Sequence, residues 1–193
     1  MKASALKKVV ATIALTTIAL PAFAHPGHGA ESGFMSGALH PLFGIDHLLA
    51  MVAVGIWAVQ LGSRAMWIVP VSFCVAMTAG AALGYAGIAL PLVEPVIAMS
   101  VLILGLLVVS AAALRPLHGA ALIAVFALFH GAAHSAESGA GIAPLAFMAG
   151  VVLTTVALHF SGAAIAALLR GRVRLAGLPL IVTGAWLATR AFV

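Results

Sequence analysis

Long apolar runs, separated by short stretches that contain polar residues, glycine or proline, dominate the chain after residue 35. Each run is about 20 residues long, which is the length that a helix needs to cross a bilayer, and none shows the strict alternation of a β-strand. Only helices and closed barrels cross lipid, because every backbone group must be hydrogen-bonded within the protein. The pattern therefore predicts an all-α membrane protein with six transmembrane helices. The expected spans are 36–61, 65–86, 93–114, 117–135, 143–169 and 174–192.

The N-terminus has the pattern of a secretory signal peptide. Three lysines precede the apolar stretch 9–20, and Ala22-Phe23-Ala24 matches a small-residue cleavage site. A cleaved signal peptide would place the mature N-terminus in the periplasm. Together with the apolar segments, it predicts a multi-pass protein of the bacterial inner membrane. The expected parts of the chain are a signal peptide at 1–24, a periplasmic head at 25–35 and a transmembrane permease domain at 36–193.

Composition and charge agree with this class. Of the 193 residues, 64% are hydrophobic and 7% are charged, whereas soluble domains are about 25% charged. The net charge of +5 comes from basic residues scattered at segment ends, so it does not indicate a nucleic-acid partner. The single cysteine, Cys74, cannot form a disulfide within the chain.

The basic residues also predict an orientation. Arg64, Arg115 and the three arginines at 170–174 lie between segments one and two, three and four, and five and six. Because basic loops stay in the cytoplasm, the other ends of the segments face the periplasm, and all four acidic residues lie there. Segments one to three run opposite to segments four to six, an order compatible with an inverted repeat of three plus three helices.

The first segment contains a group of polar residues. His40 and His47 are seven residues apart and share one face if the helix is continuous. Asp46 can bind an ion directly or orient a histidine. Pro41 suits a first helical turn, which would leave His40 beside the helix, and Gly44 allows a close neighbour or a local distortion.

The fourth segment contains the stronger motif. His130, His134 and Glu137 have the spacing i, i+4, i+7 and stack on one helical face. An ionisable group in hydrocarbon costs about 2.5–3.5 kcal/mol on insertion scales, so these groups need partners inside the bundle. Histidine with carboxylate suits a divalent transition metal. The H-E-x-x-H pattern of zinc proteases is absent from this motif.

Four further residues are candidate ligands. Glu94 begins the third segment and can attract cations, and His159 lies in the middle of the fifth segment as a ligand or relay. His25 and His28 in the head can capture a divalent ion before transport. The methionines, which include Met51, Met77, Met99 and Met148, are interpreted as helix packing, with soft ligation of copper(I) as the alternative.

These motifs resemble the HupE/UreJ family of nickel/cobalt permeases. The resemblance covers essentially the whole mature chain, and its specific parts are the first and fourth segments. The residues that carry it are His40-Pro41, Gly44-x-Asp46-His47, Leu48–Met51, Val54–Ala58, Glu94-Pro95 and Phe129-His130-Gly131-x-x-His134-x-x-Glu137. The five residues between His40 and Asp46 favour this family over the larger nickel/cobalt permeases, which have one residue fewer there. The resemblance implies uptake of nickel, and also of cobalt, for hydrogenase or urease maturation.

The resemblance implies no prosthetic group and no enzymatic activity. The expected partners are the transported divalent ion and the lipid bilayer, and a homo-oligomer or accessory subunits are compatible with the sequence. The chain has no Walker A motif, so coupling to ATP would need a partner. The alternatives are a membrane-embedded zinc-dependent hydrolase, a permease for another divalent metal, and a metal sensor or chaperone subunit that binds without transport.

Overall fold

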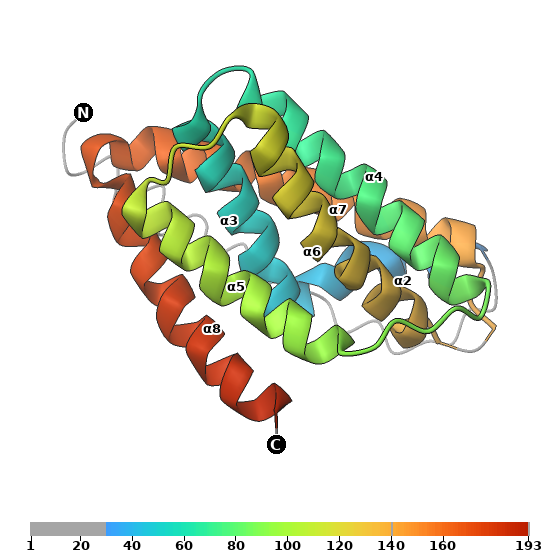
Figure 1. Cartoon of the computed structure of the whole chain (residues 1–193). Coiled ribbons are helices and arrows are strands. Elements are labelled where there is room, and N and C mark those ends of the chain that lie inside the picture. The colour runs from blue at the N-terminus through green and yellow to red at the C-terminus, as the bar shows by residue number, and fades with distance from the viewer. Residues whose placement is uncertain (1–29, 140, 193) are drawn as a thin grey trace.

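The computed structural model describes residues 30–139 and 141–192, which form helices joined by short loops (Figure 1). No strand occurs among these residues, so the expected all-α fold is confirmed. The helices are α2 (Ala30–Phe43), α3 (Ile45–Leu61), α4 (Ala65–Tyr85), α5 (Val93–Ser110), α6 (Pro116–Glu137), α7 (Pro144–Leu169), the 3₁₀ helix η1 (Arg170–Ala176) and α8 (Gly177–Ala191).

Four helical stretches of the described chain are long and apolar enough to cross a membrane, and the bent pair α2–α3 would make a fifth. The four are α4, α5, α6 and the run from α7 through η1 to α8. With 15 residues, α8 is about 22 Å long, shorter than the hydrocarbon core of about 30 Å. The chain is therefore a multi-pass membrane protein by length and composition, while six full crossings and the inverted repeat stay predictions.

The first expected segment is not one straight helix. It consists of α2 and α3, whose axes are bent by 80° at Gly44, where the backbone is extended (φ −80°, ψ 107°). Two expectations are wrong here: α2 already begins at Ala30, inside the expected head, and Pro41 lies near the end of α2 rather than in a first turn. The break costs few backbone hydrogen bonds, because the Gly44 carbonyl still accepts from the Leu48 N–H at 2.9 Å. The predicted signal peptide lies outside the described residues.

Glycines set the distance between neighbouring helices. At three crossings a glycine on each helix faces the backbone of the other, so that an added Cβ would meet a main-chain carbonyl. In membranes, small residues at such contacts let backbones approach closely and pack. The pairs are Gly37 with Gly150 between α2 and α7, Gly55 with Gly162 between α3 and α7, and Gly80 with Gly131 between α4 and α6.

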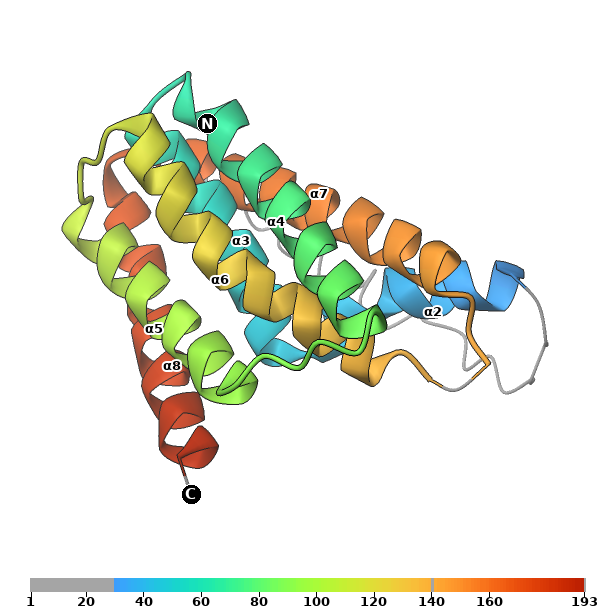
Figure 2. The same cartoon turned by 45° about the vertical axis from the view of Figure 1, so that its right-hand side comes forward.

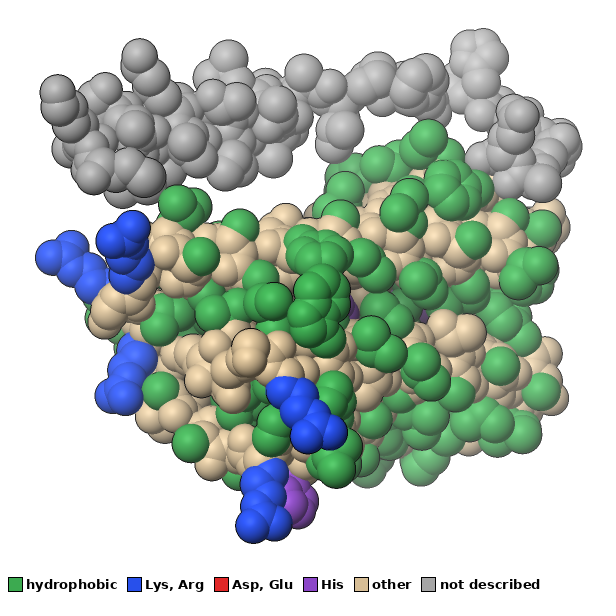
Figure 3. All heavy atoms as spheres, turned by 90° about the horizontal axis from the view of Figure 1, so that it is seen from above, with side chains coloured by type: hydrophobic (Ala, Val, Ile, Leu, Met, Phe, Trp, Pro, Cys, Tyr) green, Lys and Arg blue, Asp and Glu red, His purple; other side chains and the backbone are tan. Residues whose placement is uncertain are grey.

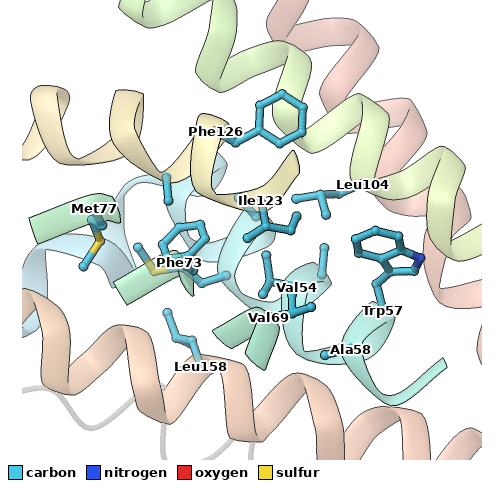
Figure 4. Packing of buried hydrophobic residues seen from close by; sticks show 14 of the residues in the cluster. Val54, Trp57, Ala58, Val69, Phe73, Met77, Leu104, Ile123, Phe126 and Leu158 are labelled. Atoms are coloured by element: carbon cyan, nitrogen blue, oxygen red, sulfur yellow. The ribbon is translucent and has the colours of Figure 1, made fainter. Parts of the chain in front are cut away.

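The buried core lies between α3, α4, α6 and α7. Figure 4 shows Val54, Phe73, Ile123 and Leu158, one from each of these helices, converging on the same interior region. The other side of the bundle is completed by α8, which runs beside α5 (Figures 1 and 2): Gly177 lies against Gly105 and Val109. Three of these four helices, α3, α6 and α7, carry six of the ten predicted ligands.

Charged residues are separated along the bundle. Because α3, α5 and α7 run in one direction (Figure 2), Arg64, Arg115 and the arginines of η1 lie at one end, called here the arginine end. Figure 3 shows basic side chains gathered in the left half of that view. Asp46 and Glu94, in the first turns of α3 and α5, lie at the opposite end with Glu137 of α6. Arg190, near the end of α8, is the described basic residue outside the arginine end.

Candidate metal centre

Four histidines from three helices form a cluster at the acidic end of the bundle. The ring centroid of His47 (α3) lies 4.4 Å from that of His134 and 4.8 Å from that of His130, both on α6. The ring of His40 (α2) lies 5.1 Å from His134 and 6.1 Å from His47. We call these four residues the histidine centre. The two predicted motifs, far apart in the sequence, therefore form one site.

Local structure explains how each ring reaches the centre. His130 and His134 are one turn apart on α6, as their spacing predicted. His40 and His47 would share a face only on one continuous helix, and this condition is not met, because the bend at Gly44 separates them. The bend instead turns the end of α2 back across the start of α3. A side chain at Gly44 would press on this arrangement, since its Cβ would lie 3.2 Å from both Asp46 Oδ1 and His47 Nδ1.

Carboxylates contact two of the four rings. Glu137 Oε2 lies 2.7 Å from His40 Nε2, and Asp46 Oδ1 lies 2.6 Å from His47 Nδ1. One ligand atom each from His40, His134 and Glu137 lies within 4.8 Å of the others. Because metal–ligand bonds are about 2.0–2.2 Å long, opposed ligand atoms around an ion are about 4 Å apart. A small closure of this trio would bring its atoms to coordinating distance.

Hydrogen bonds select the nitrogen that is free to bind an ion. The Ser100 hydroxyl donates to Ile97 O at 2.7 Å, so it accepts from His130 Nε2, which lies 3.1 Å away. His130 therefore carries its proton on Nε2 and its lone pair on Nδ1. In the same way, Nδ1 of His47 donates to Asp46, which leaves the lone pair on Nε2. Such outer contacts orient metal-binding histidines in known sites.

The free nitrogens are buried and have no partner. His130 and His134 are 0% exposed and His47 is 4% exposed. In the described part of the chain, seven buried side-chain nitrogen or oxygen atoms lack a hydrogen-bond partner, and six are histidine nitrogens: His47 Nε2, His130 Nδ1, both of His134 and both of His159. Buried polar groups are normally paired. These nitrogens have no partner within the described protein, so their lone pairs are available to a bound ligand.

The other predicted ligands have different positions. Glu94 is exposed in the first turn of α5, at the same end of the bundle as Asp46 and Glu137. His159 on α7 is 3% exposed and lies outside the histidine centre. The Phe73 ring contacts both sites, with centroid distances of 5.1 Å to His159 and 5.7 Å to His130. His25 and His28 lie outside the described residues.

Sequence reasoning missed two residues that shape the site. Ser100 is the one polar residue between Ile97 and Gly105 in an apolar run, and nothing local shows that its hydroxyl meets a histidine of another helix. Phe73 is an apolar residue in an apolar helix, so the sequence does not single it out. For Ser100, the one available clue is a lone hydroxyl in an apolar segment.

Comparison with known proteins identifies the family of the chain. The family model described as HupE / UreJ protein matches residues 13–187. The chain belongs to the HupE/UreJ family. Protein HupE of Rhizobium leguminosarum bv. viciae is 43% identical over 162 residues, which cover 83% of this chain and 85% of the relative. No solved structure matches the chain.

Family membership also argues against the alternative of an enzyme. HupE/UreJ proteins are transporters or accessory proteins and not enzymes. The chain is therefore not an enzyme, and the zinc-dependent hydrolase considered from the sequence is not supported.

Proposed function

We propose that this protein is a metal-uptake permease of the bacterial inner membrane that carries Ni²⁺, and also Co²⁺, for the maturation of hydrogenase or urease. Family membership and the multi-pass helical fold support a transport role. The observation that carries the proposal is the set of buried nitrogens of the histidine centre that have no protein partner, beside the carboxylates of Asp46 and Glu137. Nitrogen and carboxylate ligands together suit divalent transition metals.

The arrangement of charges supports a direction of transport. With the arginine end in the cytoplasm, the mouth formed by Glu94, Glu137 and Asp46 faces the periplasm. A hydrated cation is attracted to these carboxylates, with the His25 and His28 head as a first point of capture. The ion then exchanges waters for histidine nitrogens and moves inward towards His159.

The histidine centre must bind and also release its ion. Binding has to be strong enough to remove water but weak enough for onward movement, as in channels. Asp46 and Ser100 hold two rings in the binding tautomer, which lowers the cost of organising the site. Each ligating imidazole must be neutral, so protons compete with the metal. The ligand set alone does not choose nickel, since affinity for copper is higher in most such sites and geometry decides selectivity.

Uptake of radioactive nickel (⁶³Ni) in cells that lack their own nickel importers tests the proposal. Wild type, His130→Ala and His118→Ala would be compared at nanomolar nickel and matched membrane expression, with cobalt, zinc and copper as competitors. His118 is the matched control, because it is an exposed histidine on the same helix at the arginine end. We expect uptake by wild type and His118→Ala and its loss in His130→Ala.

Each outcome has a clear meaning. If a competitor suppresses ⁶³Ni uptake at a lower concentration than unlabelled nickel does, that metal binds the permease more tightly than nickel. Measurement of the metal content of the cells then shows whether the competitor is taken up as well. If a well-expressed wild type takes up none of the four metals, the permease proposal fails, and an accessory metal-binding role takes its place.

A further inference from the structure

Two methionines and a threonine converge in the interior, beyond the histidine centre. Met51 on α3, Met77 on α4 and Thr155 on α7 are each 0% exposed. Thr155 Oγ1 lies 3.3 Å from Met51 Sδ and 3.8 Å from Met77 Sδ. The two sulfurs, from different helices, thus face the same hydroxyl. We call these three residues the thioether cluster.

The thioether cluster lies between the histidine centre and His159. Met51 follows His47 by one turn of α3, and Thr155 precedes His159 by one turn of α7, so each shares a helical face with a histidine. The Met77 backbone packs against Gly131, the neighbour of His130. Figure 4 shows Met77 and Phe73 projecting from α4 into the interior between α6 and α7.

The Thr155 hydroxyl is turned away from its own helix. Serine and threonine hydroxyls in helices often bond a carbonyl of the preceding turn. The buried Ser100 does so with Ile97 O, and the exposed Thr78 and Ser161 do so with Cys74 O and Ala157 O. Thr155 instead bonds the two sulfurs. Its single proton can be donated to only one of them at a time, so the other thioether keeps its lone pairs free.

Simple packing does not require this arrangement. Methionine fills irregular gaps in cores, but a packing role would be served with the sulfurs facing apolar neighbours. Here both sulfurs face a hydroxyl inside the bundle, one helical turn from His47 on α3 and one turn from His159 on α7. Thioethers are soft ligands that favour late transition metals, whereas Mg²⁺ and Ca²⁺ take oxygen ligands.

We propose that Met51, Met77 and Thr155 form a second binding site for the transported ion, which receives a soft or borderline metal cation from the histidine centre before it reaches His159. The inference rests on the proposed permease function for the identity of the cargo. The site would pass ions that accept sulfur ligands and hold back hard cations that reach the histidine centre.

Silver(I) is a suitable probe, because it is soft and redox-stable. The full-length protein, purified in detergent with the Cys74→Ala change that removes its one thiol, would be loaded with equimolar Ag⁺ and examined by X-ray absorption. The test variant is Met51→Leu/Met77→Leu, and Met99→Leu/Met148→Leu is the control that removes the same number of thioethers. Leucine keeps the volume of methionine approximately, so both variants are expected to fold.

We expect a sulfur shell around silver in the parent and the control and its absence in the test variant. In cells, nickel uptake should fall at least tenfold in the test variant and stay within twofold of the parent in the control. Nickel binding to the purified test variant should stay within twofold, because the histidine centre is intact. Folding is checked by an unchanged size-exclusion profile. If the double variant fails to fold, the single changes Met51→Leu and Met77→Leu, each of which removes one thioether, repeat the test.

Two results would overturn the inference. One is a silver spectrum of the parent with nitrogen or oxygen neighbours only. The other is nickel uptake that the test variant leaves unchanged. A parent that takes up no nickel contradicts the permease proposal instead, and the silver measurement still decides whether the thioether cluster is a site.

Discussion

The Ser100 hydroxyl of α5 lies 3.1 Å from Nε2 of His130 on α6, while it donates its own proton to Ile97 O. The contact is fully buried, with both residues 0% exposed. Since the serine proton is already used, the serine can only accept from the ring, which leaves the His130 lone pair on Nδ1. With the Ser100 proton on Ile97 O, this contact therefore places the His130 lone pair on the unpartnered Nδ1.

Replacing Ser100 should weaken metal binding without removing a ligand. In Ser100→Ala, His130 loses the partner that sets its tautomer, and such changes typically reduce metal affinity about 10–100-fold. Equilibrium dialysis of purified protein against ⁶³Ni measures the effect. Ser110→Ala is the control, because Ser110 is on the same helix but is exposed and bonds only its own helix. Equal affinities for Ser100→Ala and wild type would refute this role.

Loss of the Asp46 carboxylate should weaken nickel binding through His47, whose ring it orients. Asp46 accepts from both the ring and the backbone N–H of His47, at 2.6 and 2.7 Å. Asp46→Asn removes the charge that stabilises the Nδ1–H form, so we expect nickel affinity to fall about 10–100-fold. The same dialysis measurement applies. If Asp46→Asn binds normally but His47→Ala does not, the carboxylate has no orienting role.

Glu94 should affect the rate of uptake rather than the strength of binding. The carboxylate is exposed at the mouth, and removing it in Glu94→Gln lowers the local attraction for cations. We expect initial nickel uptake at low ionic strength to fall about 2–5-fold, and the difference to shrink as salt screens the charge. Initial rates at two ionic strengths measure it. A change in equilibrium affinity comparable to that of Asp46→Asn would instead make Glu94 a ligand.

The glycine contacts should be needed for folding. A Cβ at Gly131 would meet the carbonyl of Met77 on α4, so Gly131→Ala must push the two helices apart. Overpacking of this kind costs about 1–3 kcal/mol or more, and we expect a lower melting temperature in detergent. Gly171→Ala is the control, because nothing lies within 4 Å of its added Cβ. Equal melting temperatures would show that the crossing is looser than described.

Nickel binding should weaken as pH falls. Only a neutral imidazole ligates, so metal binding releases any proton that the ligands hold. Protons therefore compete with nickel for the histidine nitrogens, and we expect the affinity for nickel to fall as the pH is lowered. Dialysis at several pH values gives the slope. An affinity for nickel that rises as the pH is lowered would contradict competition between protons and the metal.

The sequence alone determined the all-α membrane class, the approximate helices and the two motifs of the site. These features are local: apolar runs of membrane length need no partner to be recognised, and the i, i+4, i+7 spacing of His130, His134 and Glu137 follows from helix geometry. The HupE/UreJ resemblance was readable for the same reason, since it is carried by short motifs.

Only the tertiary structure decided how the polar groups meet. The 80° bend between α2 and α3, which brings His40 beside His134, depends on packing of α2 against α7 through Gly37 and Gly150. The partner of Ser100 and the shared hydroxyl of Met51 and Met77 lie on other helices. Such contacts are set by how helices approach and rotate in space, and no period along one helix records them.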